Sequence, residues 1–320
     1  MGSKAPVRPP KLVAGSRVAL IAPAGPLLER DDLSRAEALT RALGWEPRLG
    51  AHAGRHHGYF AGTDEERLAD LNAALADPEI DGVWCIRGGF GITRYLDRVD
   101  VDAFARRPKP VIGFSDVTAL LLGLYARTGV VTFHGPMARQ PMGPFNRDHF
   151  ERVLAVPAAA GPLGRLPQPE GVLLAQQNRI ATLVGGAAEG PLVGGNLTLV
   201  QALVGTPWLP SLDGALLFLE DVGEEIYRVD RMLGHLRLAG LLAGVAGVIV
   251  GRFTEMGRRG ADGAMGFDAV LAAHLEPLGV PVAFGFPIGH IDEQWTLPIG
   301  VRARFDATAG TVEILEPAVG

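Results

Sequence analysis

Cysteine is nearly absent from this chain, which has 320 residues and a single cysteine, Cys85. One thiol forms neither an intramolecular disulfide nor a cysteine-based metal site. Cys85 lies in the apolar segment 82–86, which is typical of a buried strand. The sequence therefore favours a protein of a reducing compartment whose fold depends on its apolar core.

Charge and long apolar runs are scarce as well. Charged residues make up 20% of the chain, the net charge is −5 and no basic stripe is present, so a nucleic acid is not expected as a partner. The apolar stretch 238–251 is shorter than the ~20 residues that span a bilayer. Residues 1–13 carry basic side chains without the apolar segment of a secretory signal. We expect a soluble, cytoplasmic protein with no membrane partner.

The first half of the chain alternates apolar strands with amphipathic helices. Hydrophobic residues make up 48% of the sequence, enough for a large core, and the length favours two domains. Thr63 and Glu66 form a capping box that predicts the start of one helix. Because the strands are continuously apolar and separated by helices, they predict a parallel sheet covered on both faces. The expected strands are 18–22, 82–86, 111–113 and 130–133.

The second half has a different pattern. Residues 157–175 are rich in proline and glycine and are predicted to be a linker. Beyond them we expect apolar strands, a helix over 224–241 and a hairpin within 302–316. The expected fold class is α/β, with an N-terminal parallel-sheet domain over 1–156 and a strand-rich, mixed α+β domain over 176–320.

A candidate nucleophile lies where the strand 111–113 meets the next helix. Gly113 ends the strand, and Ser115 occupies the turn before the helix. Such a turn exposes a serine hydroxyl and places the next backbone N–H where it can stabilise an oxyanion. The match to the Gly-x-Ser-x-Gly elbow is partial because Val117 replaces the second glycine. A serine that only caps the helix is the alternative.

Histidine is the expected base for such a serine, and His290 is the best candidate. It follows the glycine- and proline-containing segment 285–289, which comes after an apolar strand, and functional groups often occupy shaped loops of this kind. His134, at the end of a strand, is expected to be structural.

The other histidines are expected to lie in a solvated loop or at the surface. The three in the segment 51–58 lack helical pairing and acidic neighbours at ligand spacing, which favours a solvated loop over a metal site. Three more fall in helical segments and are expected at the surface. These residues are His52, His56 and His57 in the loop, and His149, His235 and His274 in the helices.

A carboxylate that orients the base and an oxyanion pocket complete the expected chemistry. Glu220 ends an apolar strand, where a carboxylate serves either as a helix cap or as a partly buried functional group. Asp221 is expected to cap the helix that follows. The amide of Asp116 and the glycine turn 87–91 are candidate oxyanion donors. A phosphate-binding role of this turn is the alternative, although the spacing fits neither a dinucleotide nor a Walker motif.

Taken together, these segments resemble the LD-carboxypeptidase family of serine peptidases. This family includes muramoyltetrapeptide carboxypeptidases and the microcin C self-immunity peptidase. The motifs occur in family order from near residue 17 to near residue 300, and they are specific as a set. They are Ile21-Ala22-Pro23-Ala24-Gly25-Pro26, Arg87-Gly88-Gly89-Phe90-Gly91, Gly113-Phe114-Ser115-Asp116, His134-Gly135-Pro136, Gly194-Gly195-Asn196-Leu197, Leu219-Glu220-Asp221 and Gly289-His290.

The resemblance implies a triad in which Ser115 is the nucleophile, His290 the base and then acid, and Glu220 the group that orients His290. It implies an oxyanion pocket formed by the amides of Asp116 and a glycine of the turn, expected to be Gly89. It also implies a site between two domains, a homodimer, and no metal or cofactor. One segment departs from the family, which commonly has Asp-Asn, an apolar residue and then Thr-Leu-Pro after the histidine, where this chain has Gln294 and Trp295 before Thr-Leu-Pro.

The leading functional hypothesis is hydrolysis of the amide between the L-centre of a diamino acid and terminal D-Ala in cytoplasmic murein tetrapeptide. A microcin C-type activity on aminoacyl-nucleotide analogues is the alternative. Such enzymes need an aromatic side chain on which the nucleobase of the substrate can stack. The stretch 176–184 contains no aromatic residue, which leaves Trp295 as a substitute. A two-domain binding protein without chemistry and an ordinary α/β-hydrolase esterase are the remaining alternatives.

Overall fold

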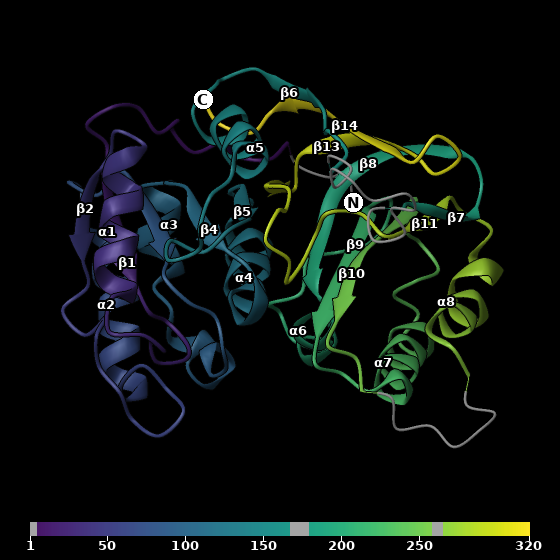
Figure 1. Ribbon diagram of the computed structural model, residues 1–320, viewed down its shortest axis with the longest axis horizontal. Coiled ribbons are helices and arrows are strands. Elements are labelled where there is room, and N and C mark those ends of the chain that lie inside the picture. The colour runs from purple at the N-terminus through teal and green to yellow at the C-terminus, as the bar shows by residue number, and fades with distance from the viewer. Residues whose placement is uncertain (1–4, 167–178, 258–264) are drawn as a thin grey trace, which may run out of the picture.

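The computed structural model describes residues 5–166, 179–257 and 265–320, and within them the chain forms two β-sheets that lie next to each other (Figure 1). The first sheet has six strands and contains most of the N-terminal half. Its strands are parallel, except that β12 runs antiparallel to β5. In spatial order they are β12 (Leu297–Ile299), β5 (Thr132–His134), β4 (Val111–Gly113), β3 (Gly82–Cys85), β1 (Arg17–Ile21) and β2 (Glu46–Leu49).

The helices of the N-terminal half connect these strands. The capping box of Thr63 and Glu66 is present at the start of α2, as predicted, and Gly129 ends α4 in the left-handed conformation. The helices are α1 (Asp32–Ala42), α2 (Asp64–Ala76), α3 (Val101–Arg106), α4 (Thr118–Thr128) and α5 (Pro144–Leu154). Four 3-10 helices occur along the described chain: η1 (Ile92–Arg94), η2 (Leu96–Arg98), η3 (Ser115–Val117) and η4 (Glu276–Leu278).

The second sheet has eight strands within the described residues and is mixed. Its centre, β8-β9-β10-β11, is parallel, and its flanking strands pair antiparallel. The spatial order is β6 (Ala159–Pro162), β14 (Thr311–Pro317), β13 (Arg302–Asp306), β8 (Ala187–Asn196), β9 (Leu216–Val222), β10 (Gly247–Thr254), β11 (Val282–Phe284) and β7 (Ala181–Val184). The helices of this half are α6 (Leu197–Ala202), α7 (Ile226–Leu238) and α8 (Phe267–Leu275). A parallel-sheet half and a strand-rich mixed half confirm the predicted fold class.

Two segments connect the halves more closely than the sequence indicates. Part of the expected linker 157–175 is strand β6, which pairs with β14, while residues 167–178 lie outside the described part. The short strand β12 comes from the C-terminal half but joins the first sheet beside β5. The boundaries 1–156 and 176–320 therefore remain a proposal.

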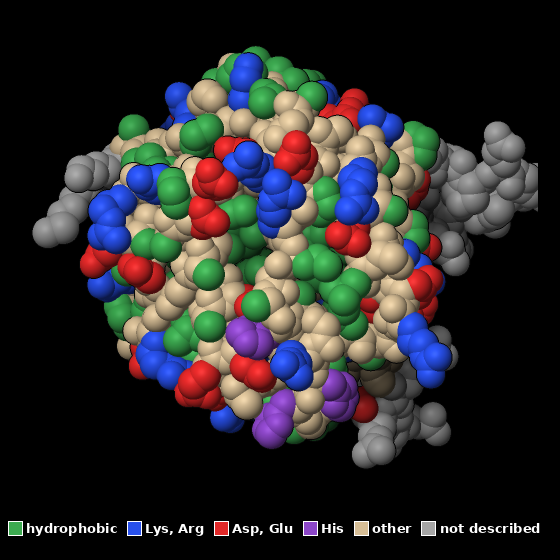
Figure 2. Space-filling model, turned by 90° about the vertical axis from the view of Figure 1, so that its left-hand side faces the viewer, with side chains coloured by type: hydrophobic (Ala, Val, Ile, Leu, Met, Phe, Trp, Pro, Cys, Tyr) green, Lys and Arg blue, Asp and Glu red, His purple; other side chains and the backbone are tan. Residues whose placement is uncertain are grey.

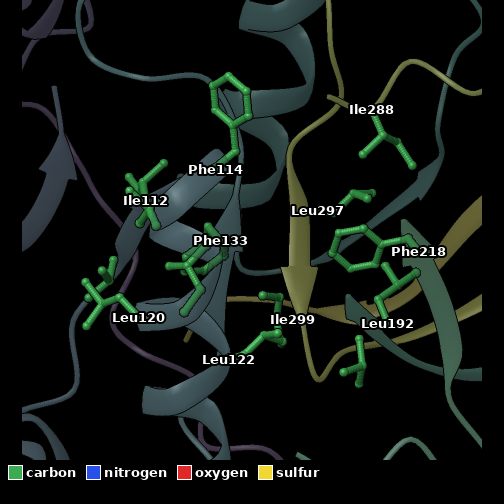
Figure 3. Packing of buried hydrophobic residues seen from close by; sticks show 14 of the residues in the cluster. Ile112, Phe114, Leu120, Leu122, Phe133, Leu192, Phe218, Ile288, Leu297 and Ile299 are labelled. Atoms are coloured by element: carbon green, nitrogen blue, oxygen red, sulfur yellow. The ribbon is translucent and has the colours of Figure 1, made fainter. Parts of the chain in front are cut away.

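One apolar core runs through both sheets. Leu297 and Ile299 of β12 lie beside Phe218 and Leu192 of the second sheet, with Phe133 of the first sheet on their other side (Figure 3). All five side chains are buried. Burial of this apolar surface holds the halves together and so fixes the position of any site between them. Among the described helices, none combines the length and the apolar character needed to cross a membrane.

Candidate active site

Ser115 occupies a sharp turn between β4 and α4. Its φ is 61°, in the left-handed region that a residue with a side chain rarely adopts. Gly113 makes the turn possible, because a Cβ there would lie 2.9 Å from Val117 Cγ1 and 3.2 Å from Cys85 Cβ. Non-glycine residues in this conformation concentrate at functional sites, where the surrounding structure enforces them.

The imidazole of His290 lies between the Ser115 hydroxyl and the Glu220 carboxylate. His290 Nε2 is 3.0 Å from Ser115 Oγ, and His290 Nδ1 is 2.8 Å from Glu220 Oε2. Both distances are within hydrogen-bond range. The structure thus brings together three side chains from β4–α4, β9 and the loop after β11. Glu220 lies within β9 and is fully buried.

The ring of His290 is also held by an aromatic neighbour. The ring of Phe114 meets it edge-on, with the centroids 4.8 Å apart. Behind Phe114 lies His134, whose two ring nitrogens find no hydrogen-bond partner within the described residues. Burial, and secondarily the nearby His290, lowers the pKa of His134 to about 3. His134 is therefore a neutral packing residue at neutral pH, in agreement with a structural role.

The glycine turn after β3 faces the serine. A Cβ on Gly88 would lie 2.8 Å from Ser115 Cβ and 3.0 Å from Ser115 Oγ, so only glycine fits beside Ser115. Gly89 has a φ of 113° and lies against Gly25, whose N–H donates to the Gly88 carbonyl at 2.8 Å. Gly88 is thus the residue of this turn that contacts Ser115 most closely, while Gly89 shapes the turn.

Asp116 ties this turn to the serine turn. Its buried carboxylate accepts a hydrogen bond of 2.9 Å from the N–H of Ile92 and another from that of Gly91. Burial raises the Asp116 pKa to about 6, against the opposing effect of these N–H groups. The residue expected to supply an oxyanion N–H therefore also fixes the glycine turn through its side chain.

The cavity beside Ser115 holds residues that the sequence did not single out as site residues. It measures about 300 Å³, and its lining includes Arg87, Arg139, Met137 and Gln140 together with Ser115 and His290. Arg87 was visible only as the first residue of the glycine motif. Arg139 carries no local signal, since tertiary folding alone brings it here.

A second cavity is also lined by His290. It measures about 570 Å³, and its described lining includes Arg252, Phe253, Asp292 and Glu293. Burial lowers the pKa of Arg252. His290 thus lines both cavities.

Three expectations about neighbouring residues are wrong. Asp221 does not cap the following helix: its carboxylate accepts from the N–H and hydroxyl of Thr198 and from the Asn196 amide, so it holds the start of α6 instead. His149 is buried, where it accepts from the N–H of Gly164 and lies 2.7 Å from the Phe145 carbonyl oxygen. The third is that Trp295 can serve as an aromatic platform for a substrate.

Trp295 is not available as an aromatic platform. Its ring is buried against Phe286, and its indole N–H donates to the Gly164 carbonyl at 2.8 Å. Gln294 beside it is buried too, and its N–H donates to Asn146. The departure from the family pattern at 294–295 therefore lies in the core.

The histidines of the loop 51–58 do not line either of these cavities. His56 and His57 are exposed, and His52 pairs with Asp70 at 2.8 Å. On the face that carries α1, α2 and β2, histidine side chains gather near one edge, and positive and negative charges are interspersed (Figure 2). Among the described residues, no group of three or more His, Cys, Asp or Glu side chains is arranged to hold a metal ion.

Comparison with known proteins identifies the family to which the chain belongs. Models of the LD-carboxypeptidase N-terminal and C-terminal domains match residues 18–135 and 189–305. The chain is 39% identical over 321 residues to the putative carboxypeptidase SCO6489 of Streptomyces coelicolor, covering 98% of this chain and 97% of the relative. It is 33% identical over 294 residues to the murein tetrapeptide carboxypeptidase of Pseudomonas aeruginosa, covering 90% and 92%.

Among solved structures, MccF in complex with glutamyl sulfamoyl guanosine superposes with a TM-score of 0.87 at 26% identity, covering 98% of this chain and 100% of that one. Both family models match in order and together span most of the chain. The chain therefore belongs to the LD-carboxypeptidase family and is a serine-type carboxypeptidase.

Proposed function

We propose that this enzyme removes terminal D-Ala from murein tetrapeptide in the cytoplasm, as part of cell-wall recycling, by hydrolysing the amide that joins D-Ala to the L-centre of the diamino acid. The observation that carries the proposal is the continuous contact from Ser115 through His290 to Glu220. The relative from Pseudomonas aeruginosa, named a murein tetrapeptide carboxypeptidase, supports the choice of substrate.

The geometry supports a defined direction of proton transfer. A proton on His290 Nδ1 donates to Glu220, which leaves Nε2 free to accept the proton of the Ser115 hydroxyl. Ser115 Oγ then attacks the scissile carbonyl, and the tetrahedral oxyanion accepts from the N–H of Asp116 and from that of Gly89.

The same imidazole completes both halves of the reaction. Protonated His290 donates to the nitrogen of the leaving D-Ala, and a tripeptidyl ester remains on Ser115. Water enters and attacks the ester carbonyl while His290 removes its proton. The bond to Ser115 Oγ then breaks, His290 returns the proton to that oxygen, and the tripeptide leaves. The negative charge of Glu220, buried behind the ring, stabilises the imidazolium in each step.

The site takes its residues from both halves, so it depends on their docking. Ser115 and Asp116 come from the first, whereas Glu220 and His290 come from the second. We further propose that the enzyme needs no metal or cofactor, since these side chains supply the nucleophile, the base and the charge stabilisation. A homodimer is proposed as well.

The structural similarity to MccF supports a second candidate, cleavage of aminoacyl-nucleotide analogues. The two candidates share the triad and differ in the group that leaves. One enzyme preparation is incubated with murein tetrapeptide and, separately, with an aminoacyl sulfamoyl adenosine, and the products are identified by mass. We expect loss of D-Ala from the tetrapeptide to be the faster reaction. Faster cleavage of the adenosine compound, with the tetrapeptide intact, would select the second candidate.

A further inference from the structure

Two arginines line the cavity that contains the nucleophile. Arg87 and Arg139 share it with Ser115 and His290. Both side chains are partly exposed, so both can be reached by a bound molecule. Their positions are linked to the serine through the glycine turn, because Gly88 contacts Ser115 while the neighbouring Gly25 lies against the Arg87 guanidinium.

Each guanidinium is held by a contact that leaves part of its hydrogen-bonding capacity unused. Arg87 donates through Nη1 to the Pro26 carbonyl. Arg139 forms an ion pair of 3.5 Å with Asp32, a fully buried carboxylate that also accepts from two backbone N–H groups. The buried Nε of Arg139 has no partner within the described residues. A guanidinium has five N–H donors, so both groups retain donors for a ligand.

The charges around the two arginines do not cancel. Burial lowers the Arg87 pKa, the charge of Arg139 lowers it further, and Asp32 acts in the opposite direction. Two positive groups thus lie close to one carboxylate, in a cavity whose described lining contains no acidic side chain. A cavity of this charge stabilises an anion, and paired guanidiniums suit the planar, two-oxygen geometry of a carboxylate.

We infer that Arg87 and Arg139 bind the terminal carboxylate of the peptide substrate and thereby restrict cleavage to its last residue. The inference rests on the proposed function, for which it names the recognition site. In a peptide cut before its last residue, the terminal carboxyl carbon is two bonds from the leaving nitrogen. That nitrogen must approach His290 Nε2, so a carboxylate two bonds away is within reach of the cavity that adjoins both Ser115 and His290.

Binding is measured by calorimetry on the Ser115→Ala variant, which separates recognition from turnover. The probes are murein tetrapeptide ending in D-Ala and the same peptide ending in D-alaninamide. We expect the carboxylate form to bind roughly tenfold or more tightly, since a hydrogen bond to a charged group is lost in the amide. When Arg87→Gln or Arg139→Gln is added to Ser115→Ala, the preference for the carboxylate form over the amide should fall to about twofold or less.

Two further variants keep the test informative. Arg87→Lys retains the charge without the paired donors, so part of the preference should remain. Arg252→Gln removes one positive charge from the second cavity, which Arg87 and Arg139 do not line, and should leave the preference unchanged. Thermal unfolding verifies that each variant is folded.

The possible failures are distinguishable. Equal binding of the acid and the amide, or a preference lost in Arg252→Gln but kept in the Arg87 and Arg139 variants, would overturn this inference alone. Release of D-Ala by the unsubstituted enzyme tests the proposed function separately. Absence of binding by either peptide would overturn the inference, and absence of D-Ala release by the unsubstituted enzyme would overturn the proposed function as well.

Discussion

Gly289 lies so close to Glu220 that a Cβ at position 289 would be 2.8 Å from Glu220 Oε2 and 2.9 Å from Glu220 Cβ. The φ of Gly289 is 118°, which an alanine adopts only with strain. The glycine that precedes the histidine thus lets the buried carboxylate reach the imidazole.

Gly289→Ala is therefore expected to displace His290 or Glu220 and to reduce kcat by roughly 100-fold, because small misplacements of catalytic groups have effects of this size. Steady-state hydrolysis of murein tetrapeptide measures it. The matched control is Gly266→Ala, at a position with a negative φ and no atom within 4 Å of the added Cβ, and it should keep its activity. Full activity of Gly289→Ala would show that the Glu220 contact is not needed.

Substitution of any member of the proposed triad should remove most activity while the fold is retained. We expect Ser115→Ala, His290→Ala and Glu220→Ala each to lower kcat by roughly 10³-fold or more. Because the three groups act as a unit, the double variant Ser115→Ala with His290→Ala should be little slower than either single variant. Turnover and circular dichroism are measured on the same samples. A Ser115→Ala enzyme with undiminished turnover would exclude this serine as the nucleophile.

Much of the fold follows from local patterns in the sequence. The apolar strands, the capping box at Thr63 and the hairpin near the C-terminus are encoded within a few residues each, and the structure has all of them. The short strand β12 was not predicted. It has three residues, one of them Pro298, and its partner β5 lies far away in the sequence. No local pattern identifies such a pairing, because it depends on how the two halves dock.

The residues of the candidate site likewise fall into those that a local sequence pattern indicates and those that only tertiary folding brings together. Ser115 and His290 lie in turns with a glycine signal, and Glu220 lies in an apolar strand where a carboxylate is conspicuous. Arg139 has no such local signal. The role of Asp221 has none either, because its partners Asn196 and Thr198 belong to another strand and helix. Contacts of this kind arise only from tertiary folding, so the sequence alone left open which residues would bind a terminal carboxylate.

Gly88→Ala should impair the reactivity of Ser115 without disturbing the fold. The new Cβ would lie 2.8 Å from Ser115 Cβ, so Ser115 or the glycine turn has to move. We expect a loss of roughly 100-fold in kcat and a comparable loss in the rate at which a fluorophosphonate labels the enzyme, since both reactions need the same hydroxyl geometry. Mass spectrometry of the labelled protein follows the second reaction. Labelling at the unsubstituted rate would indicate that the turn yields freely and does not position Ser115.

The buried carboxyl of Asp116 should make stability depend on pH in the direction opposite to that of an ion-paired carboxylate. Its pKa is raised from the usual 3.8 to about 6 in the folded state, chiefly by burial. Folding therefore favours the protonated form. The stabilising contribution is complete below the unfolded pKa and is lost as the pH rises through about 6.

Asp116→Asn removes this titration. Relative to the variant, the unsubstituted protein should lose about 3 kcal/mol in the free energy of unfolding between pH 3.5 and pH 7.5. Altered hydrogen bonds to Ile92 and Gly91 shift the difference between the two proteins by the same amount at every pH, so only its slope reports the titration. Urea unfolding at several pH values measures it, with the exposed Asp97→Asn as the control for removal of one negative charge. A difference that is constant between pH 3.5 and pH 7.5 would show that folding leaves the pKa of Asp116 unshifted. A change in the opposite direction would show that folding lowers this pKa, with the N–H groups of the glycine turn outweighing its burial.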